Sequence, residues 1–294
     1  MRGTVTALIL LLAVSAHAKK RLRIEKSGVV TSAVAENIQL AKTLMFQSNR
    51  QRALDQLEKA KPFARSRADL KEISEKRLLF LEQFFSSKAF QRFQEARSLA
   101  ELQRWDECLR EIDHIKIDDS VADSDNLLVL RLKADCQYSA KQYDLSLKTH
   151  QQVLTVVPDD RHALFGLVDI ALEQKRYVQG VTLLEGITLK SSSETERFAI
   201  LKARLLRALE RPEEADEILK ADHEAYLDHI EVLYELGMLY TTMSGHDWPA
   251  RKMISLFVVR CKRMKESELK TRHLEMLLPK AQSILDSLDK KLGV

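Results

Sequence analysis

Residues that interrupt helices are scarce in this sequence. Its 294 residues include only 8 Gly and 5 Pro, and both residue types end helices or form turns. This scarcity predicts a mostly helical chain with short connections. No apolar run beyond the N-terminus approaches the ~20 residues that a membrane-spanning helix needs.

An excess of one charge is also missing, as are the motifs of common active sites. The net charge is only +4, so we expect no strong field for polyanions and no binding of nucleic acid. The eight His are scattered, and the sequence has no His-Glu-x-x-His, Cys-x-x-Cys, phosphate-binding glycine loop or Gly-x-Ser-x-Gly turn. We therefore predict no metal site, no cofactor and no catalytic residue, and we expect that the protein is not an enzyme.

The three cysteines, Cys108, Cys136 and Cys261, do not have the spacing of a disulfide framework. Two interpretations stay open: all three are small buried apolar residues, or Cys108 and Cys136 are bridged, because they lie in adjacent predicted hairpins. The chain contains no Asn-x-Ser/Thr. N-glycosylation is thereby excluded, which favours a bacterial periplasm over a eukaryotic secretory lumen.

The first residues have the pattern of a secretory signal. Arg2 precedes a short apolar run at 7–13, and Ala16-His17-Ala18 offers small residues to a signal peptidase, which predicts cleavage after Ala18. We expect an exported chain that is periplasmic or secreted. Residues 19–33 form a predicted basic arm, and Lys19–Lys26 would contact anionic membrane or an acidic partner, unless this segment is simply a solvated terminus.

The stretch from Asn126 to Lys190 repeats itself. Each half has an apolar-periodic helix, a short polar turn and a second helix. Tyr143 and Tyr177 open the two second helices 34 residues apart, and each is followed three residues later by a small residue, Ser146 or Gly180. Self-similarity at this period indicates stacked helical hairpins, and these residues resemble the tetratricopeptide repeat (TPR) family.

The resemblance extends over most of residues 34–261. Trp105 and Pro212 occupy the positions of the two tyrosines in other hairpins. The stretch with Leu236-Gly237 followed by Tyr240 resembles the first helix of a TPR more closely than the other stretches of this sequence do. His150 departs from it, because a large apolar residue is usual there. The resemblance implies an all-α, right-handed superhelical solenoid at 34–261, with an extra helix inserted within 64–102 and a C-terminal capping helix region at 262–294.

In this family the first helices of the hairpins line a concave groove that holds other polypeptides. Helical spacing and the resemblance together place twelve residues there: Phe93, Arg97, Arg131, Asp135, Tyr138, His162, Phe165, Asp169, Arg197, Arg204, Arg207 and Tyr234. Interleaved aromatic and Arg residues are typical of peptide anchors, and the three last-named Arg would receive carboxylates. The competing interpretation is that Phe93 and Phe165 are core residues and the Arg side chains are solvated.

The function predicted from these features is a non-catalytic scaffold or adaptor. It would bind a segment of another envelope protein or a peptide in its groove, within a cell-envelope assembly. The alternative is a module that binds cell-wall glycan or anionic lipid through the basic arm and the Arg cluster. An enzyme on a helical-repeat frame would require a deep pocket with converging His and acidic residues.

Overall fold

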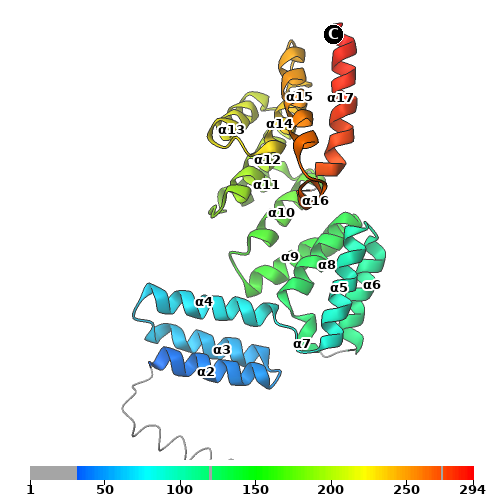
Figure 1. Ribbon diagram of the computed structural model, residues 1–294. Coiled ribbons are helices and arrows are strands. Elements are labelled where there is room, and N and C mark those ends of the chain that lie inside the picture. The colour runs from blue at the N-terminus through cyan, green and yellow to red at the C-terminus, as the bar shows by residue number, and fades with distance from the viewer. Residues whose placement is uncertain (1–31, 119–120, 273) are drawn as a thin grey trace, which may run out of the picture. The chain divides into compact units, whose positions relative to one another are not determined.

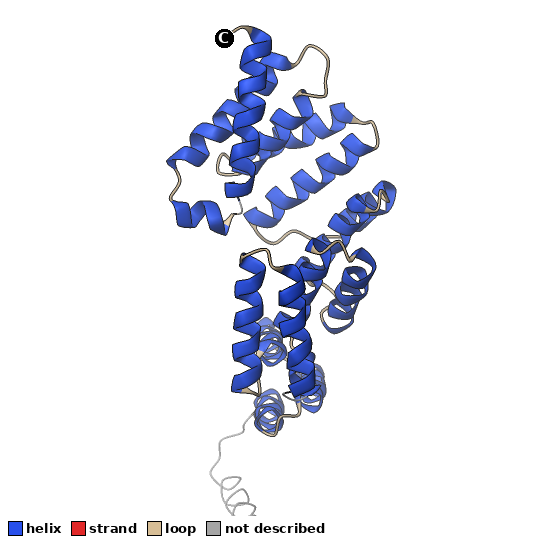
Figure 2. Cartoon of the chain, turned by 90° about the vertical axis from the view of Figure 1, so that its right-hand side faces the viewer, coloured by secondary structure: helices blue, strands red, loops and turns tan. Residues whose placement is uncertain are grey.

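All regular structure in the described part of the chain is helical. A computed structural model describes residues 32–118, 121–272 and 274–294, and over these ranges it contains no strand (Figures 1 and 2). The predicted signal peptide and nearly all of the basic arm lie outside the described residues. Within the described ranges, no helix is long and apolar enough to span a membrane.

The helices pair in chain order, as the sequence predicts. The six hairpins are α2 (Ala33–Phe46) with α3 (Arg50–Ala60), α5 (Ser87–Glu101) with α6 (Trp105–Asp118), α8 (Leu127–Ser139) with α9 (Tyr143–Val156), α10 (Arg161–Glu173) with α11 (Tyr177–Glu185), α12 (Ser192–Ala208) with α13 (Pro212–Ala225), and α14 (Ile230–Tyr240) with α15 (Asp247–Arg263). Trp105, Tyr143, Tyr177 and Pro212 each open a second helix, which confirms their predicted positions.

The remaining helices are an insertion and a C-terminal addition. The inserted helix is α4 (Arg67–Glu82), flanked by the short η1 (Lys61–Phe63), and a four-residue helix α7 (Val121–Ser124) precedes α8. After the last hairpin come α16 (Glu266–Thr271), η2 (Leu274–Met276) and α17 (Leu277–Leu292), which packs along α15. Pro279 lies in the first turn of α17, where its missing N–H costs no helical hydrogen bond.

Five of the hairpin turns share one conformation. Each contains a residue other than Gly with a left-handed φ of 56–61°, at Ser48, Gln103, Lys141, Lys175 and Glu210. In each turn the next N–H donates to a carbonyl five residues back, for example Gln142 N to Gln137 O at 2.8 Å and Arg176 N to Ala171 O at 2.7 Å. This is the bonding of a Schellman helix end. Its recurrence gives the chain the fold of a TPR-like stack of helical hairpins.

The described part of the chain divides into two compact units, residues 32–89 with 121–126, and residues 90–118 with 127–272 and 274–294. The sequence pattern predicts one repeat domain at 34–261. The difference arises between α4 and α5, close to the Ser86-Ser87 pair, where the helix is interrupted. In the first unit the buried Arg50 donates to Phe80 O (3.0 Å) and Gln83 O (2.6 Å), and the buried Asp123 accepts from Phe85 N and Ser86 N.

In the second unit, a disulfide joins Cys108 of α6 to Cys136 of α8. Of the two interpretations of the cysteines, the structure shows the bridged one for this pair, while Cys261 is a free, buried thiol. The α14–α15 crossing depends on Gly237, because a Cβ there would lie 2.5 Å from Ile254 Cγ1 and closer still to Cδ1. Small residues at such crossings let the two helices of a hairpin approach closely.

Candidate interaction groove

Successive first helices in the second unit are joined by ion pairs. Three ion pairs run from α8 to α14: Arg131 with Asp160 (2.5 Å), Asp169 with Arg197 (2.7 Å), and Arg204 with Glu235 (2.5 Å). In addition, His162 Nε2 lies 2.8 Å from Asp135 Oδ1. Asp160 is also the N-cap of α10, where its side chain accepts from Ala163 N at 2.8 Å. Most of the predicted groove charges therefore link neighbouring hairpins.

These pairs correct the prediction of a free Arg cluster. Arg197 forms an ion pair with Asp169 and lies over the Phe165 ring at 5.0 Å. Arg204 forms an ion pair with the buried Glu235. The prediction failed because helical spacing places side chains on a face but does not show the acids that the next helix brings opposite them. Of the three, Arg207 is the one without an ion pair among the described residues.

Three aromatic residues predicted in the groove are core residues instead. Phe93 is 6% exposed, Phe165 is 2% exposed and Tyr234 is 8% exposed. Tyr234 packs against the Phe257 ring with centroids 5.3 Å apart. They are buried because the faces of a first helix that contact its partner and the next hairpin leave only a narrow stripe for solvent. For Phe93 and Phe165, the competing interpretation is thus the one that the structure supports.

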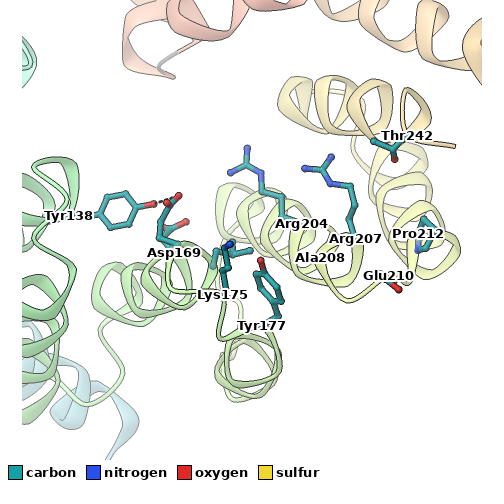
Figure 3. Close-up of a pocket in the computed structure, with 12 residues that line it drawn as sticks. Tyr138, Asp169, Lys175, Tyr177, Arg204, Arg207, Ala208, Glu210, Pro212 and Thr242 are labelled. Carbon is teal, nitrogen blue, oxygen red and sulfur yellow. Dashed lines mark hydrogen bonds between the residues drawn. The ribbon is translucent and has the colours of Figure 1, made fainter.

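A cavity of about 840 Å³ collects four of the predicted residues: Tyr138 of α8, Asp169 of α10, and Arg204 and Arg207 of α12. Figure 3 shows Arg204 and Arg207 extending from α12 into the same space that Tyr138 and Asp169 face. The volume lies within the ~300–1,000 Å³ of typical ligand pockets. We call this cavity, lined by residues of α8, α10, α11, α12 and the adjoining turns, the groove pocket.

Two cations of the groove pocket are free to meet a ligand. Arg207 and Lys175 both line it, and neither forms an ion pair within the described ranges of the chain. The backbone of Lys175 has the left-handed turn conformation (φ 58°). An unpaired guanidinium presents a fork of donors that matches a carboxylate. The carboxylates of Asp169, Glu173 and Glu210 also line the pocket, so an anionic group would bind to Arg207 or Lys175 individually, without breaking any of the inter-helix ion pairs.

Burial raises the pKa of two further groups at this site. Burial, together with the nearby carboxylates Asp169 and Glu173, raises the pKa of Tyr138 well above its ordinary value, so the phenol stays neutral. Burial also raises the pKa of Asp169, against the opposing effect of Arg197. Tyr138 and Tyr143 have ring centroids 5.6 Å apart, and both hydroxyls lie near Glu173, at 3.5 and 3.3 Å. Of these two rings, Tyr138 lines the groove pocket, together with Tyr177, and we call Tyr138 and Tyr177 the aromatic wall of the pocket.

The sequence prediction missed the pocket residues that lie outside first helices. Lys175 and Glu210 belong to turns, Tyr177 opens α11, and Thr242 follows α14. The sequence offers no clear signal for them, because the left-handed turn residues differ in type from one hairpin to the next. Of the other predicted residues, Arg97 pairs with Glu101 of its own helix at 3.7 Å.

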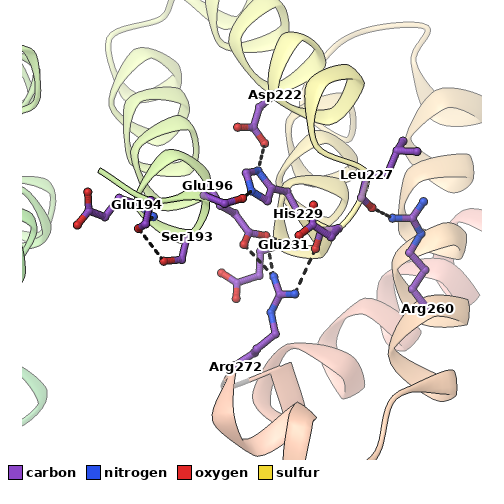
Figure 4. Close-up of polar contacts among 12 residues, drawn as sticks. Ser193, Glu194, Glu196, Asp222, Leu227, His229, Glu231, Arg260 and Arg272 are labelled. Carbon is purple, nitrogen blue, oxygen red and sulfur yellow. Dashed lines mark hydrogen bonds and ion pairs between the residues drawn. The ribbon is translucent and has the colours of Figure 1, made fainter. Parts of the chain in front are cut away.

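A buried polar cluster lies apart from the groove pocket (Figure 4). Arg272, directly after α16, donates to both carboxylate oxygens of Glu196 of α12 at 2.9 and 2.8 Å. Burial raises the pKa of Glu196, and Arg272 opposes this effect. The bridge attaches the C-terminal segment to the last hairpins, in accordance with the predicted capping role of this segment.

The same cluster contains a Ser–His–Asp chain. His229 Nδ1 lies 2.6 Å from Asp222 Oδ2, and His229 Nε2 lies 2.7 Å from Ser192 Oγ. These distances resemble those of a nucleophilic triad. However, His229 is 2% exposed and stacked on Tyr226, and none of the three residues lines the groove pocket or the other cavities described below. Asp222 Oδ2 is bonded to His229, whereas the buried Asp222 Oδ1 has no hydrogen-bond partner. Without a substrate cavity, we interpret the chain as a structural hydrogen-bond network. Among the described residues, no group of His, Cys, Asp and Glu is arranged to hold a metal ion.

Comparison with known proteins finds solved structures of low sequence identity. No protein-family model and no curated protein matches the sequence. Similar structures include a tetratricopeptide repeat protein from Parabacteroides merdae, at 14% identity over 88% of this chain and 98% of that one, with a TM-score of 0.48. Others are MamA from Desulfovibrio magneticus RS-1 (14%, covering 62% and 100%, TM-score 0.47) and pilF of Pseudomonas aeruginosa (16%, covering 68% and 95%, TM-score 0.38). The class that the hairpins and their turns define is a TPR-like helical-repeat protein.

Proposed function

We propose that this protein is a non-catalytic scaffold that binds a segment of another polypeptide in the groove pocket. The observation that carries the proposal is the pair of unpaired cations, Arg207 and Lys175, beside the aromatic wall of Tyr138 and Tyr177. An extended segment would place an acidic side chain or its terminal carboxylate on Arg207 and an apolar side chain against the tyrosine rings. Charged hydrogen bonds fix the register, while ring contacts supply buried area.

We further propose that the protein works outside the cytoplasm, in the periplasm or after secretion, with an envelope protein as partner. The signal pattern that ends at Ala18 motivates this location. The Cys108–Cys136 disulfide supports it, because such bridges persist in oxidising compartments and are rare in the cytosol. Mass spectrometry of the protein recovered from its own cells tests the location. A mature N-terminus at Lys19 is expected, and a retained Met1 would contradict export by this route.

Site-specific photo-crosslinking tests the groove. A photoreactive residue at Ala208, which lines the groove pocket, is compared with one at Lys148, which is exposed on α9. We expect Ala208 to capture one recurring polypeptide segment, identified by mass spectrometry, that Lys148 does not capture. Equal capture from both positions, or capture of glycan in place of polypeptide, would contradict the proposal.

A further inference from the structure

A second cavity, separate from the groove pocket, surrounds an exposed tryptophan. It measures about 720 Å³, shares no lining residue with the groove pocket, and is formed by α13, the end of α14 and the first half of α15. We call it the Trp248 pocket. Its lining residues are Lys220, Tyr240, Trp248, Pro249, Arg251, Lys252, Met253, Ser255 and Leu256.

One large aromatic side chain of the pocket is exposed to solvent, next to half-buried apolar residues. Trp248 is 56% exposed although it lies in the first turn of a helix that is otherwise well packed. Tyr240, Pro249, Met253 and Leu256 continue this surface into the pocket. An exposed Trp beside other apolar groups is the residue type that dominates binding energy at protein interfaces.

The charged residues of the pocket are all basic. Lys220, Arg251 and Lys252 line it, and the lining contains no carboxylate. Two of these cations form ion pairs with residues outside the lining, Lys220 with Asp216 at 2.6 Å and Arg251 with Asp289 at 2.5 Å. Arg251 also lies over the Trp248 ring at 5.9 Å. Lys252 is exposed and has no ion pair within the described residues, so the pocket has an uncompensated positive charge at its edge.

We propose that the Trp248 pocket is a second docking site, and that it takes an acidic polypeptide segment carrying an aromatic or aliphatic anchor residue. The anchor packs on Trp248 and Met253, and an adjacent Asp or Glu pairs with Lys252. A sugar fits this chemistry less well, because its hydroxyl donors need acceptors and the lining offers no carboxylate or side-chain amide. The protein would then hold two segments at once, which increases the affinity for a partner that carries both.

Selection from a random-peptide phage library on the full chain, with Trp248→Ala as counter-selection, tests the proposal. Trp248 is exposed, so its truncation should leave the helical content unchanged by circular dichroism. We expect enriched peptides that combine Asp or Glu with an aromatic or aliphatic residue. Enrichment of basic peptides, or of none that distinguish the two proteins, would overturn the proposal.

The enriched peptides are then measured by fluorescence. The chain has two Trp, so Trp105→Phe leaves Trp248 as the single reporter. A peptide without Trp should shift its emission to the blue, and Trp248→Ala should weaken binding at least about tenfold, as for an interface hot spot. Lys252→Glu is a second surface variant. It should weaken the binding of the acidic peptides and strengthen the binding of copies in which Lys replaces each acidic residue. Unchanged affinity in both variants would refute the site, as would an emission shift caused by oligosaccharide alone. Arg207→Ala should leave this binding intact, which separates a failure here from a failure at the groove pocket.

Discussion

Replacing Gly237 by Ala tests whether the close hairpin crossing is real. In an exposed helix interior this change stabilises by about 0.8–1.0 kcal/mol, because Ala has the higher helix propensity. Here the new Cβ would meet Ile254, at 2.5 Å from Cγ1 and 3.3 Å from its backbone N, and Ile254 is fully buried. Overpacking of this kind costs about 1–3 kcal/mol. Since the backbone contact leaves the helices little room to adjust, we expect a net loss of about 1–2 kcal/mol.

The sign of the effect should reverse when Ile254 is truncated. In an Ile254→Ala background the obstructing side chain is gone, so Gly237→Ala should stabilise by up to about 1 kcal/mol. The coupling energy between the two changes is then about 2–3 kcal/mol, at the upper end for residues in contact.

Urea unfolding of the four proteins in this cycle measures the coupling. Gly186→Ala is the matched control, because Gly186 has an ordinary right-handed φ of −78° and its nearest neighbour to a new Cβ is Leu183 O at 3.5 Å. The control should be neutral or slightly stabilising. If Gly237→Ala stabilises the unmodified chain as well, the close approach of α14 and α15 is refuted.

Three further predictions concern other parts of the second unit. Burial lowers the pKa of His150 to about 4, so its stabilising effect is complete above its ordinary pKa of 6.5 and is lost as the pH falls toward 4. Between these pH values the free energy of unfolding should fall by up to about 3 kcal/mol, and His150→Leu should remove this fall. If the urea midpoints of His150→Leu show the same dependence on pH as those of the unmodified chain, the prediction is contradicted. Replacing Cys108 and Cys136 together by Ala opens a link across 28 residues, which should lower the free energy of unfolding by about 3.5 kcal/mol; a loss under about 1 kcal/mol would argue against the bridge. Ser192 should not react with a fluorophosphonate probe, because its partner His229 lies buried outside any described substrate cavity; labelling lost in a Ser192→Ala variant would revive the enzyme hypothesis.

The fold could be predicted from sequence because its signals are local. Tyr143, Tyr177 and Pro212 open second helices where their spacing places them, and the small residues Gly180 and Gly237 lie at close approaches. The helix starts and the Gly237 crossing depend on a helix and its immediate partner, whereas a Cβ on Gly180 would meet Leu205 of the next hairpin. The departure at His150 is explained by the next hairpin, since its imidazole packs against Gly166 of α10, where a Cβ would collide with the ring.

The site depends on pairing between hairpins, which the sequence alone does not show. Tyr138, Asp169, Arg204 and Arg207 line the groove pocket, and their binding of a partner stays a prediction. Arg197 and Arg204 form ion pairs with acids one hairpin away. A single sequence shows the charge of each face but not which residue of the next helix lies opposite it. The same limit applies to the Trp248 pocket, whose residues come from three different helices.

The affinity of the groove pocket for its captured segment is the most direct test of the proposed scaffold function. A synthetic copy of the segment crosslinked at Ala208 would be titrated against the unmodified chain, Arg207→Ala and the surface control Lys148→Ala. A hydrogen bond to a charged group contributes about 1.5–3 kcal/mol, so Arg207→Ala should weaken binding roughly ten- to hundredfold, with Lys148→Ala unchanged. Equal affinities for all three proteins would show that the groove pocket is not where this protein binds its partner.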